Sequence, residues 1–181
     1  MSSTEHTTST ATGIPAGTWS ADTVHSSIGF AVKYSGVMTF RGTFKEFDAK
    51  LVDGRLEGTV KVDSVVVDDP NLAGHLQTPD FFDAEQYPEL RFVSETIERD
   101  GDKVSIAGDL TLRGVTQPVE ITGTITGPIT DAYGNERLGL DLETSINRRD
   151  YGINWQMELP SGDPGLADEV TITANLALVQ A

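Results

Sequence analysis

Apolar and polar residues alternate with a period of two along most of this sequence, as Ile28, Phe30, Val32 and Tyr34 do within residues 27–34. This period is typical of β-strands with one apolar face. Phe44 falls out of phase with Phe47, which predicts a bulge or bend between them. The dipeptide Asp53-Gly54 lies between two alternating stretches and is a strong signal for a tight hairpin turn. About eight such antiparallel strands need one shared interior, so the sequence predicts an all-β fold that closes into a barrel without exposed edges.

One long segment, residues 75–92, interrupts this rhythm with the sequence HLQTPDFFDAEQYPELRF. Its many large apolar residues are unusual for a surface loop, so we expect it to fold onto an apolar surface as a cap. An alternative is a crossover whose aromatic side chains complete a core. We expect a short helical insertion around residues 69–83, which Asp69 or Asn71 caps, and a second turn that starts at Pro79.

Several strings resemble the YceI-like family of lipocalin-like barrels, which bind polyisoprenoid lipids. The resemblance spans about residues 17 to 180, and three positions depart from the family pattern. Tyr34 stands where the family commonly has histidine, Ala73-Gly74 replaces an Arg-Asp pair that pins the helix, and Tyr151 replaces phenylalanine. The matching strings are HLQTPDFFDAEQYP with LRFVS, the opening Asp22, His25, Ser26 and Phe30, then RGTFKEF, LRGVTQP and INRRDYGI.

Length and composition are consistent with one domain at residues 14–181, preceded by a Ser/Thr-rich tail at residues 1–13 that we expect to be disordered. Structure should begin near Gly17, with a first short strand around Trp19. The formal charge of −15 argues against nucleic acid and against adsorption to anionic membranes. No apolar run is long enough for membrane insertion, and no secretory signal is evident, so we expect a cytoplasmic protein. The resemblance implies a possible homodimer.

A barrel of about eight strands is either filled by its own side chains or hollow enough for one slender ligand. Gly58, Gly108, Gly123 and Ala174 lie in phase with large inward residues, so each removes side-chain volume from the interior. Such glycines also occur at bends and bulges, which is the alternative. The sequence and the resemblance favour a hollow barrel.

The inward positions carry almost no charge, which suits a hydrocarbon chain because each buried CH₂ contributes roughly 0.8 kcal/mol. Phe81, Phe82 and Trp155 are expected at the mouth, although each could belong to a core. The ligand-binding residues predicted from the sequence are Ile28, Phe30, Val32, Tyr34, Phe44, Leu56, Val60, His75, Phe81, Phe82, Phe92, Ile106, Leu110, Ile121, Leu140, Leu142, Arg148, Trp155, Ile172 and Leu176.

No constellation of residues indicates catalysis. His25 and His75 lack a spaced cluster of metal ligands, and adjacent strand residues such as His25 and Ser26 face opposite ways. Arg148 and Arg149 could receive a pyrophosphate, phenol or quinone head group, or could form an ion pair with Asp150 or a neighbouring acid.

The sequence therefore predicts a non-enzymatic protein without metal or cofactor that binds, stores or transports a long-chain isoprenoid lipid. The lipid would be of the polyprenyl or isoprenoid quinone type. The alternative is a filled barrel that acts as a stress-associated interaction module.

Overall fold

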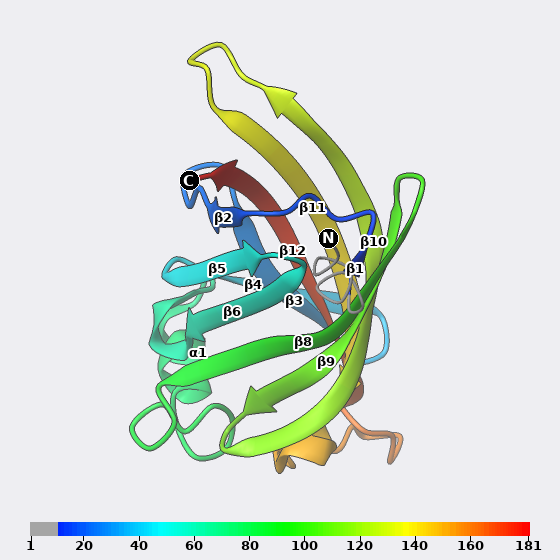
Figure 1. The fold of residues 1–181 in the computed structure, drawn as a ribbon. Helices are drawn as coiled ribbons and strands as arrows, with labels where there is room; N and C mark the ends of the chain where they lie inside the picture. Colours follow the sequence, from blue (N-terminus) through cyan, green and yellow to red (C-terminus); the bar gives the residue numbers. More distant parts are fainter. Residues whose placement is uncertain (1–10) are drawn as a thin grey trace.

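The computed structural model describes residues 11–181, which fold into a twisted, closed sheet with little helix (Figure 1). The helical elements are α1 (Pro70–Leu76) and the 3₁₀ helices η2 (Val62–Ser64) and η3 (Arg148–Tyr151). The strands are β1 (Ala11–Thr12), β2 (Thr18–Ala21), β3 (Ser27–Tyr34), β4 (Met38–Phe44), β5 (Phe47–Val52), β6 (Arg55–Lys61), β7 (Val65–Val66), β8 (Glu89–Asp100), β9 (Lys103–Leu112), β10 (Val115–Thr130), β11 (Glu136–Asn147) and β12 (Leu166–Gln180).

The strands combine into a closed antiparallel barrel of eight strand positions, as predicted. β2 and β3 together occupy one position, because both pair with β12. β4 and β5 together occupy the next, since β4 pairs with β3 and β5 pairs with β2. The bend between Phe44 and Phe47 that the sequence predicts lies at the junction of β4 and β5. Pairing of β11 with β12 closes the barrel.

The N-terminal end of the described chain differs from the expected disordered tail at residues 1–13. Residues 1–10 lie outside the described residues, but Ala11 and Thr12 form β1, which pairs in parallel with β8. Arg99 on β8 donates from Nη1 to the carbonyl of Gly13 at 3.2 Å. Regular structure therefore begins before Gly17, because β8 offers a free edge and a guanidinium to this segment.

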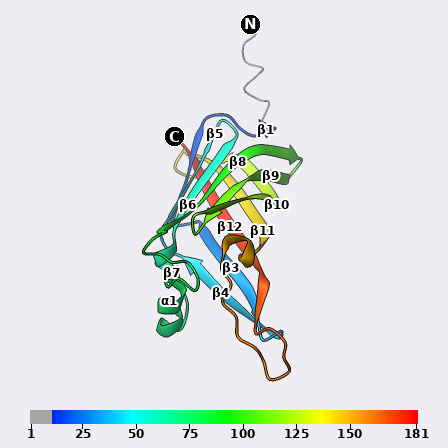
Figure 2. The ribbon, with the colours of Figure 1, turned by 90° about the horizontal axis from the view of Figure 1, so that it is seen from below.

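The insertion between β7 and β8 contains one helix rather than two helical turns. Asp69 caps α1 by accepting a hydrogen bond from the backbone N of Asn71 at 2.9 Å, as predicted. The second turn expected at Pro79 is not helical; the backbone N of Phe82 donates to the carbonyl of Leu76 at 2.9 Å in a series of tight turns. Figure 2 shows α1, the turn between β3 and β4 and the orange segment after η3 at the same end of the barrel.

The opposite end of the barrel is solid. Trp19 is 1% exposed, and its Nε1 donates to the carbonyl of Ala16 at 3.2 Å. Its partner across the sheet, Leu51, is equally buried, and Leu178 at the end of β12 is fully buried. The indole therefore plugs one end, so any internal space must open toward the end that carries α1.

Candidate ligand-binding cavity

The interior of the barrel holds a large apolar cavity of about 690 Å³, within the range of about 300–1,000 Å³ typical of small-molecule sites. A second cavity of about 90 Å³ lies next to it. The exposed residues Met38, Thr39, Asp69 and Asn71 line the large cavity, so its mouth lies between the β3–β4 turn and the start of α1. The barrel is therefore hollow, as the sequence predicts.

Alternation along β3 and β4 builds one wall of the large cavity. Ile28, Phe30, Val32 and Tyr34 all line it from β3. Gly42 lies opposite Phe30 in the register, and a Cβ at Gly42 would come within 2.7 Å of the Phe30 ring. The absence of a side chain at Gly42 therefore leaves room for the Phe30 ring. Further aromatic rings extend from Phe30 toward the lid. The centroid of Phe30 lies 5.9 Å from that of Phe40, 5.7 Å from that of Phe44 and 6.4 Å from that of Phe82.

The lid of the cavity consists of α1 and the following turns through residue 88. Phe81, Phe82 and Leu72 line the cavity from this lid, so the aromatic segment folds down onto the barrel as expected. His75 and Phe81 pack against Trp155, with ring centroids 5.4 Å from the indole in both cases. The lid therefore contacts the segment after η3 across the mouth.

Arg113, in the turn between β9 and β10, anchors the lid to the barrel. Its Nη1 donates to the carbonyls of Pro79 and Phe81, the latter at 3.0 Å. His75 also pairs with Asp80 at 3.0 Å within the lid. These contacts take the place of the ion pair that the resemblance implies at Ala73-Gly74. Sequence reasoning missed Arg113, because the signal is only one basic residue in a hairpin turn.

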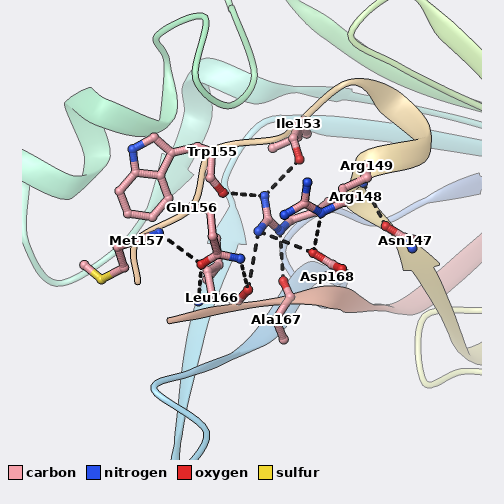
Figure 3. Close-up of polar contacts among 10 residues, drawn as sticks. All are labelled: Asn147, Arg148, Arg149, Ile153, Trp155, Gln156, Met157, Leu166, Ala167 and Asp168. Carbon is pink, nitrogen blue, oxygen red and sulfur yellow. Dashed lines mark hydrogen bonds and ion pairs between the residues drawn. The ribbon is translucent and has the colours of Figure 1, made fainter. Parts of the chain in front are cut away.

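Arg148 is the one charged side chain built deeply into the cavity wall, with 3% of its surface exposed (Figure 3). Its Nε donates to the carbonyl of Ala167 at 2.9 Å, and Nη1 donates to those of Ile153 and Trp155 at 2.9 and 2.7 Å. Nη2 lies 3.4 Å from the carbonyl of Leu166. Burial lowers the pKa of this guanidinium from its usual value.

The carboxylate beside the paired arginines is Asp168; the sequence named Asp150 or a neighbouring acid, and the structure favours the second alternative. Asp168 lies 3.6 Å from Nη2 of Arg148 and 2.7 Å from Nε of Arg149. Gln156 completes this junction, because its amide exchanges two hydrogen bonds with the backbone of Leu166 at 2.7 and 2.8 Å. The cluster ties the segment after η3 to the start of β12.

The structure divides the predicted ligand-binding residues into three groups along the barrel. Ile106 and Leu140 line neither cavity and are buried in the solid core, so their assignment to the lumen is corrected. Leu56, Phe92, Leu110, Ile121, Leu142 and Leu176 line only the small cavity. The large cavity is lined by Ile28, Phe30, Val32, Tyr34, Phe44, Val60, His75, Phe81, Phe82, Arg148, Trp155 and Ile172.

Two of the four small residues thought to hollow the barrel have another role. A Cβ at Gly123 would lie 1.8 Å from the carbonyl oxygen of Asp141, and one at Gly108 would lie 2.4 Å from that of Val93. These glycines allow close approach of neighbouring strands. Gly108 lies opposite Ser94, where the pairing of β8 with β9 is irregular, which fits the alternative of a bulge, whereas the pairing around Gly123 is regular. Gly58 and Ala174 do line the small cavity, so they remove side-chain volume from the lumen as expected.

Other residues of the large cavity were not identified from the sequence. Phe40 could have been found, because it shares the phase of Phe44 on β4. Val170 could also have been found, because it shares the phase of Ile172 on β12. Leu166 lies beyond an irregularity in the pairing of β12 with β3. The residues that line the large cavity but were not predicted from the sequence are Met38, Thr39, Phe40, Asp69, Asn71, Leu72, Leu76, Leu90, Leu112, Ile146, Ile153, Met157, Leu166 and Val170.

Three polar side chains around the cavity, those of Asp69, His75 and Arg148, are already engaged with the protein. Asp69 caps α1, His75 pairs with Asp80, and Arg148 holds backbone carbonyls. Within residues 11–181, no group of three or more His, Cys, Asp or Glu side chains is arranged to hold a metal ion. None of the helices in this described part of the chain has the length and apolar character needed to cross a membrane.

The acidic side chains with the most strongly shifted pKa values lie outside the cavity. Hydrogen bonds from His25, at 2.7 Å, and from Arg137, at 3.0 Å, hold the pKa of Asp22 well below its usual value. Arg137 also donates from Nε to Asp131 at 2.8 Å, which lowers the pKa of that carboxyl to about 2. These contacts join the β10–β11 hairpin to the loop before β3, so His25 has a structural role here.

A barrel closed at one end, hollow at the other and covered by a short aromatic lid defines a lipocalin-like β-barrel protein. The family model described as the YceI-like domain matches residues 19–178, so the chain belongs to the YceI-like family. Protein YceI of Escherichia coli O157:H7 is 32% identical over 140 residues, which make up 74% of this chain and 73% of that protein.

Solved structures show the same fold. The Campylobacter jejuni YCEI protein is 26% identical, with a TM-score of 0.70 over 88% of this chain and 96% of that one. A polyisoprenoid binding domain from Saccharophagus degradans is 13% identical, with a TM-score of 0.71 over 90% of this chain and 98% of that one. At that identity, the likeness to the second structure concerns the fold alone.

Proposed function

We propose that this protein binds and shields an uncharged long-chain isoprenoid lipid without transforming it. The observation that carries the proposal is the apolar cavity of about 690 Å³ at the lidded end of the barrel. Burial of each CH₂ contributes roughly 0.8 kcal/mol, so a chain of several isoprene units can bind tightly without a salt bridge. The shared fold of the S. degradans polyisoprenoid binding domain supports this ligand class.

The contacts of Arg148 argue for an uncharged head group. An anionic head such as pyrophosphate needs free donors, but this guanidinium already serves the carbonyls of Ile153, Trp155 and Ala167. Taking those donors away would leave buried carbonyls without partners, which costs about 1–3 kcal/mol each. A quinone, phenol or alcohol head avoids this cost, and the Tyr34 hydroxyl on the cavity wall can donate to its oxygen.

A carrier role fits the side chains around the cavity better than catalysis does. General acid–base or nucleophilic chemistry needs titratable groups aimed at one reacting atom. Asp69, His75 and Arg148 instead cap α1, pair within the lid and support backbone, respectively. Exchange of the ligand would then require the lid to move away from Trp155.

Native mass spectrometry of the freshly purified protein, followed by organic extraction, tests this proposal. The expected result is a stoichiometric prenyl lipid that Val170→Phe displaces, because Val170 lines the cavity. Val24→Phe is the matched control, since Val24 is 84% exposed and lies outside both cavities. The same spectra report whether the chain forms the homodimer expected from the sequence. A bare mass that stays bare after incubation with prenyl quinones would overturn the proposal and favour an interaction module.

A further inference from the structure

The small cavity lies beyond the large one on the way to the solid end of the barrel. Along β12 the large cavity is lined by Val170, both cavities by Ile172, and the small one alone by Leu176. The next inward residue of this strand, Leu178, is fully buried. The small cavity is therefore the inner end of the lumen, and the packed core around Trp19 lies behind it.

Four aliphatic side chains separate the two cavities, because they line both of them: Ile28, Val60, Leu90 and Ile172. Val60 and Leu90 are direct partners on β6 and β8. Ile28 and Ile172 lie on the neighbouring strands β3 and β12. The constriction is thus formed by flexible aliphatic side chains from two pairs of strands, with no backbone across it.

The chemistry of the inner cavity suits hydrocarbon and not water. Its wall comes from all eight strand positions and is mostly aliphatic. The one polar part is the seam where the β10–β11 ladder ends, and there the Thr144 hydroxyl donates to the carbonyl of Glu120 at 2.8 Å. About 10–15 Å³ is enough for one water, so a space of about 90 Å³ holds several atoms. Away from this seam, where Glu143 and Thr144 line the cavity, a water would lack polar partners, whereas a methyl or methylene group would gain dispersion contacts.

We propose that the inner cavity receives the far end of the ligand's apolar chain, and that the constriction and the packed core behind it set the chain length. This inference rests on the proposed lipid-binding function. A short chain fills only the large cavity, and a longer one passes between Ile28 and Ile172 on one side and Val60 and Leu90 on the other. Chains that exceed both cavities cannot be fully buried.

Gly58 offers a direct way to close the inner cavity. It lines that cavity, its φ lies outside the left-handed region, and an added Cβ would have its nearest neighbour, the carbonyl of Asp48, at 3.7 Å. Gly58→Val therefore adds side-chain volume to the inner cavity from a Cβ that meets no backbone atom closer than 3.7 Å. Gly139→Val is the matched control, because Gly139 lies on β11, lines neither cavity and has its nearest neighbours at 3.9 Å.

The experiment measures the affinity of the full-length protein for prenyl alcohols of increasing length, from farnesol to dodecaprenol, by native mass spectrometry or fluorescence competition. We expect Gly58→Val to leave the short alcohols unaffected and to weaken the long ones, by roughly fourfold for each methylene that no longer fits. Ile172→Ala should strengthen binding of the longest chains, because it widens the constriction.

Each outcome decides the inference. A length profile of Gly58→Val that matches Gly139→Val at every length would overturn the inner cavity as a binding site, while lipid binding itself would stand. If the affinity of Ile172→Ala depends on chain length as that of wild type does, the constriction does not set the preferred chain length. Wild-type protein that binds no prenyl alcohol of any length would overturn both this inference and the proposed function.

Discussion

Replacing Arg148 with methionine tests whether this buried arginine supports the mouth of the cavity or receives a ligand. Methionine keeps much of the side-chain length and removes every donor. Three hydrogen bonds of 2.7–2.9 Å to the carbonyls of Ile153, Trp155 and Ala167 disappear. Hydrogen bonds to charged groups contribute about 1.5–3 kcal/mol each, so the gross loss is about 4.5–9 kcal/mol.

Two effects reduce that loss. The guanidinium no longer has to be desolvated, and water entering from the cavity can reach some of the released carbonyls. We therefore expect the free energy of unfolding to fall by about 3–4 kcal/mol, close to the cost of breaking a buried charged pair. With a urea m value of about 1–3 kcal/mol/M, the midpoint of unfolding should move down by about 1–4 M.

Urea unfolding of wild type, Arg148→Met and Arg149→Gln provides the comparison. Arg149 is exposed and pairs with the exposed Asp168, so its substitution should cost less than about 1 kcal/mol. The reasoning is refuted if Arg148→Met unfolds within about 0.5 kcal/mol of wild type and loses binding of an anionic prenyl pyrophosphate. That result would make Arg148 a head-group receptor, the role considered from the sequence.

Two further predictions concern groups outside the cavity. Asp22 and Asp131 have lowered pKa values, Asp22 mainly because of the hydrogen bond from His25 and then that from Arg137, and Asp131 mainly because of Arg137. The stability that these carboxylates contribute is therefore present above the usual pKa of 3.8 and is lost as the pH falls toward about 2. Arg137→Met should therefore flatten the fall of the urea midpoint between about pH 5 and 2, and parallel curves for variant and wild type would contradict this. Tyr151 is 2% exposed, its hydroxyl lacks a hydrogen-bond partner among the described residues, and burial raises its pKa to about 12. Tyr151→Phe should raise the free energy of unfolding by about 1 kcal/mol in urea titrations, and a clear loss would show that the hydroxyl has a partner.

The sequence predicted the barrel well because period-two alternation is a local property of each strand. Ile28, Phe30, Val32 and Tyr34 all face the cavity, as their alternation indicates. The Asp69 cap is likewise local, since it depends on residues two positions apart. Features of this kind can be predicted from a few neighbouring residues.

Features that depend on contacts between distant strands could not be predicted in this way. Ile106 has the same alternation as the cavity residues but lies in the packed core. Gly108 and Gly58 look alike in sequence, yet one allows close strand approach and the other lines a cavity. The anchoring of the lid by Arg113 also joins residues more than thirty positions apart, with a separation of 32 to Phe81. Each depends on register and packing across the barrel, for which the sequence carries no local signal.

The same strands form a solid end and a hollow end because of what lies across from them. Near the C-terminal end of β12, the inward Leu178 meets the region filled by Trp19 and Leu51. Toward its start, Val170 and Ile172 face a lumen covered by α1 and the turns that follow it. The cavity therefore lies under the helix and turns, and not beside the indole. The inward face of β12 is apolar along its whole length, and its partners decide where it fills a core and where it lines a site. The lid contacts of Arg113, His75 and Trp155 thus hold a cover over a cavity whose inner end is closed by the packed core around Trp19.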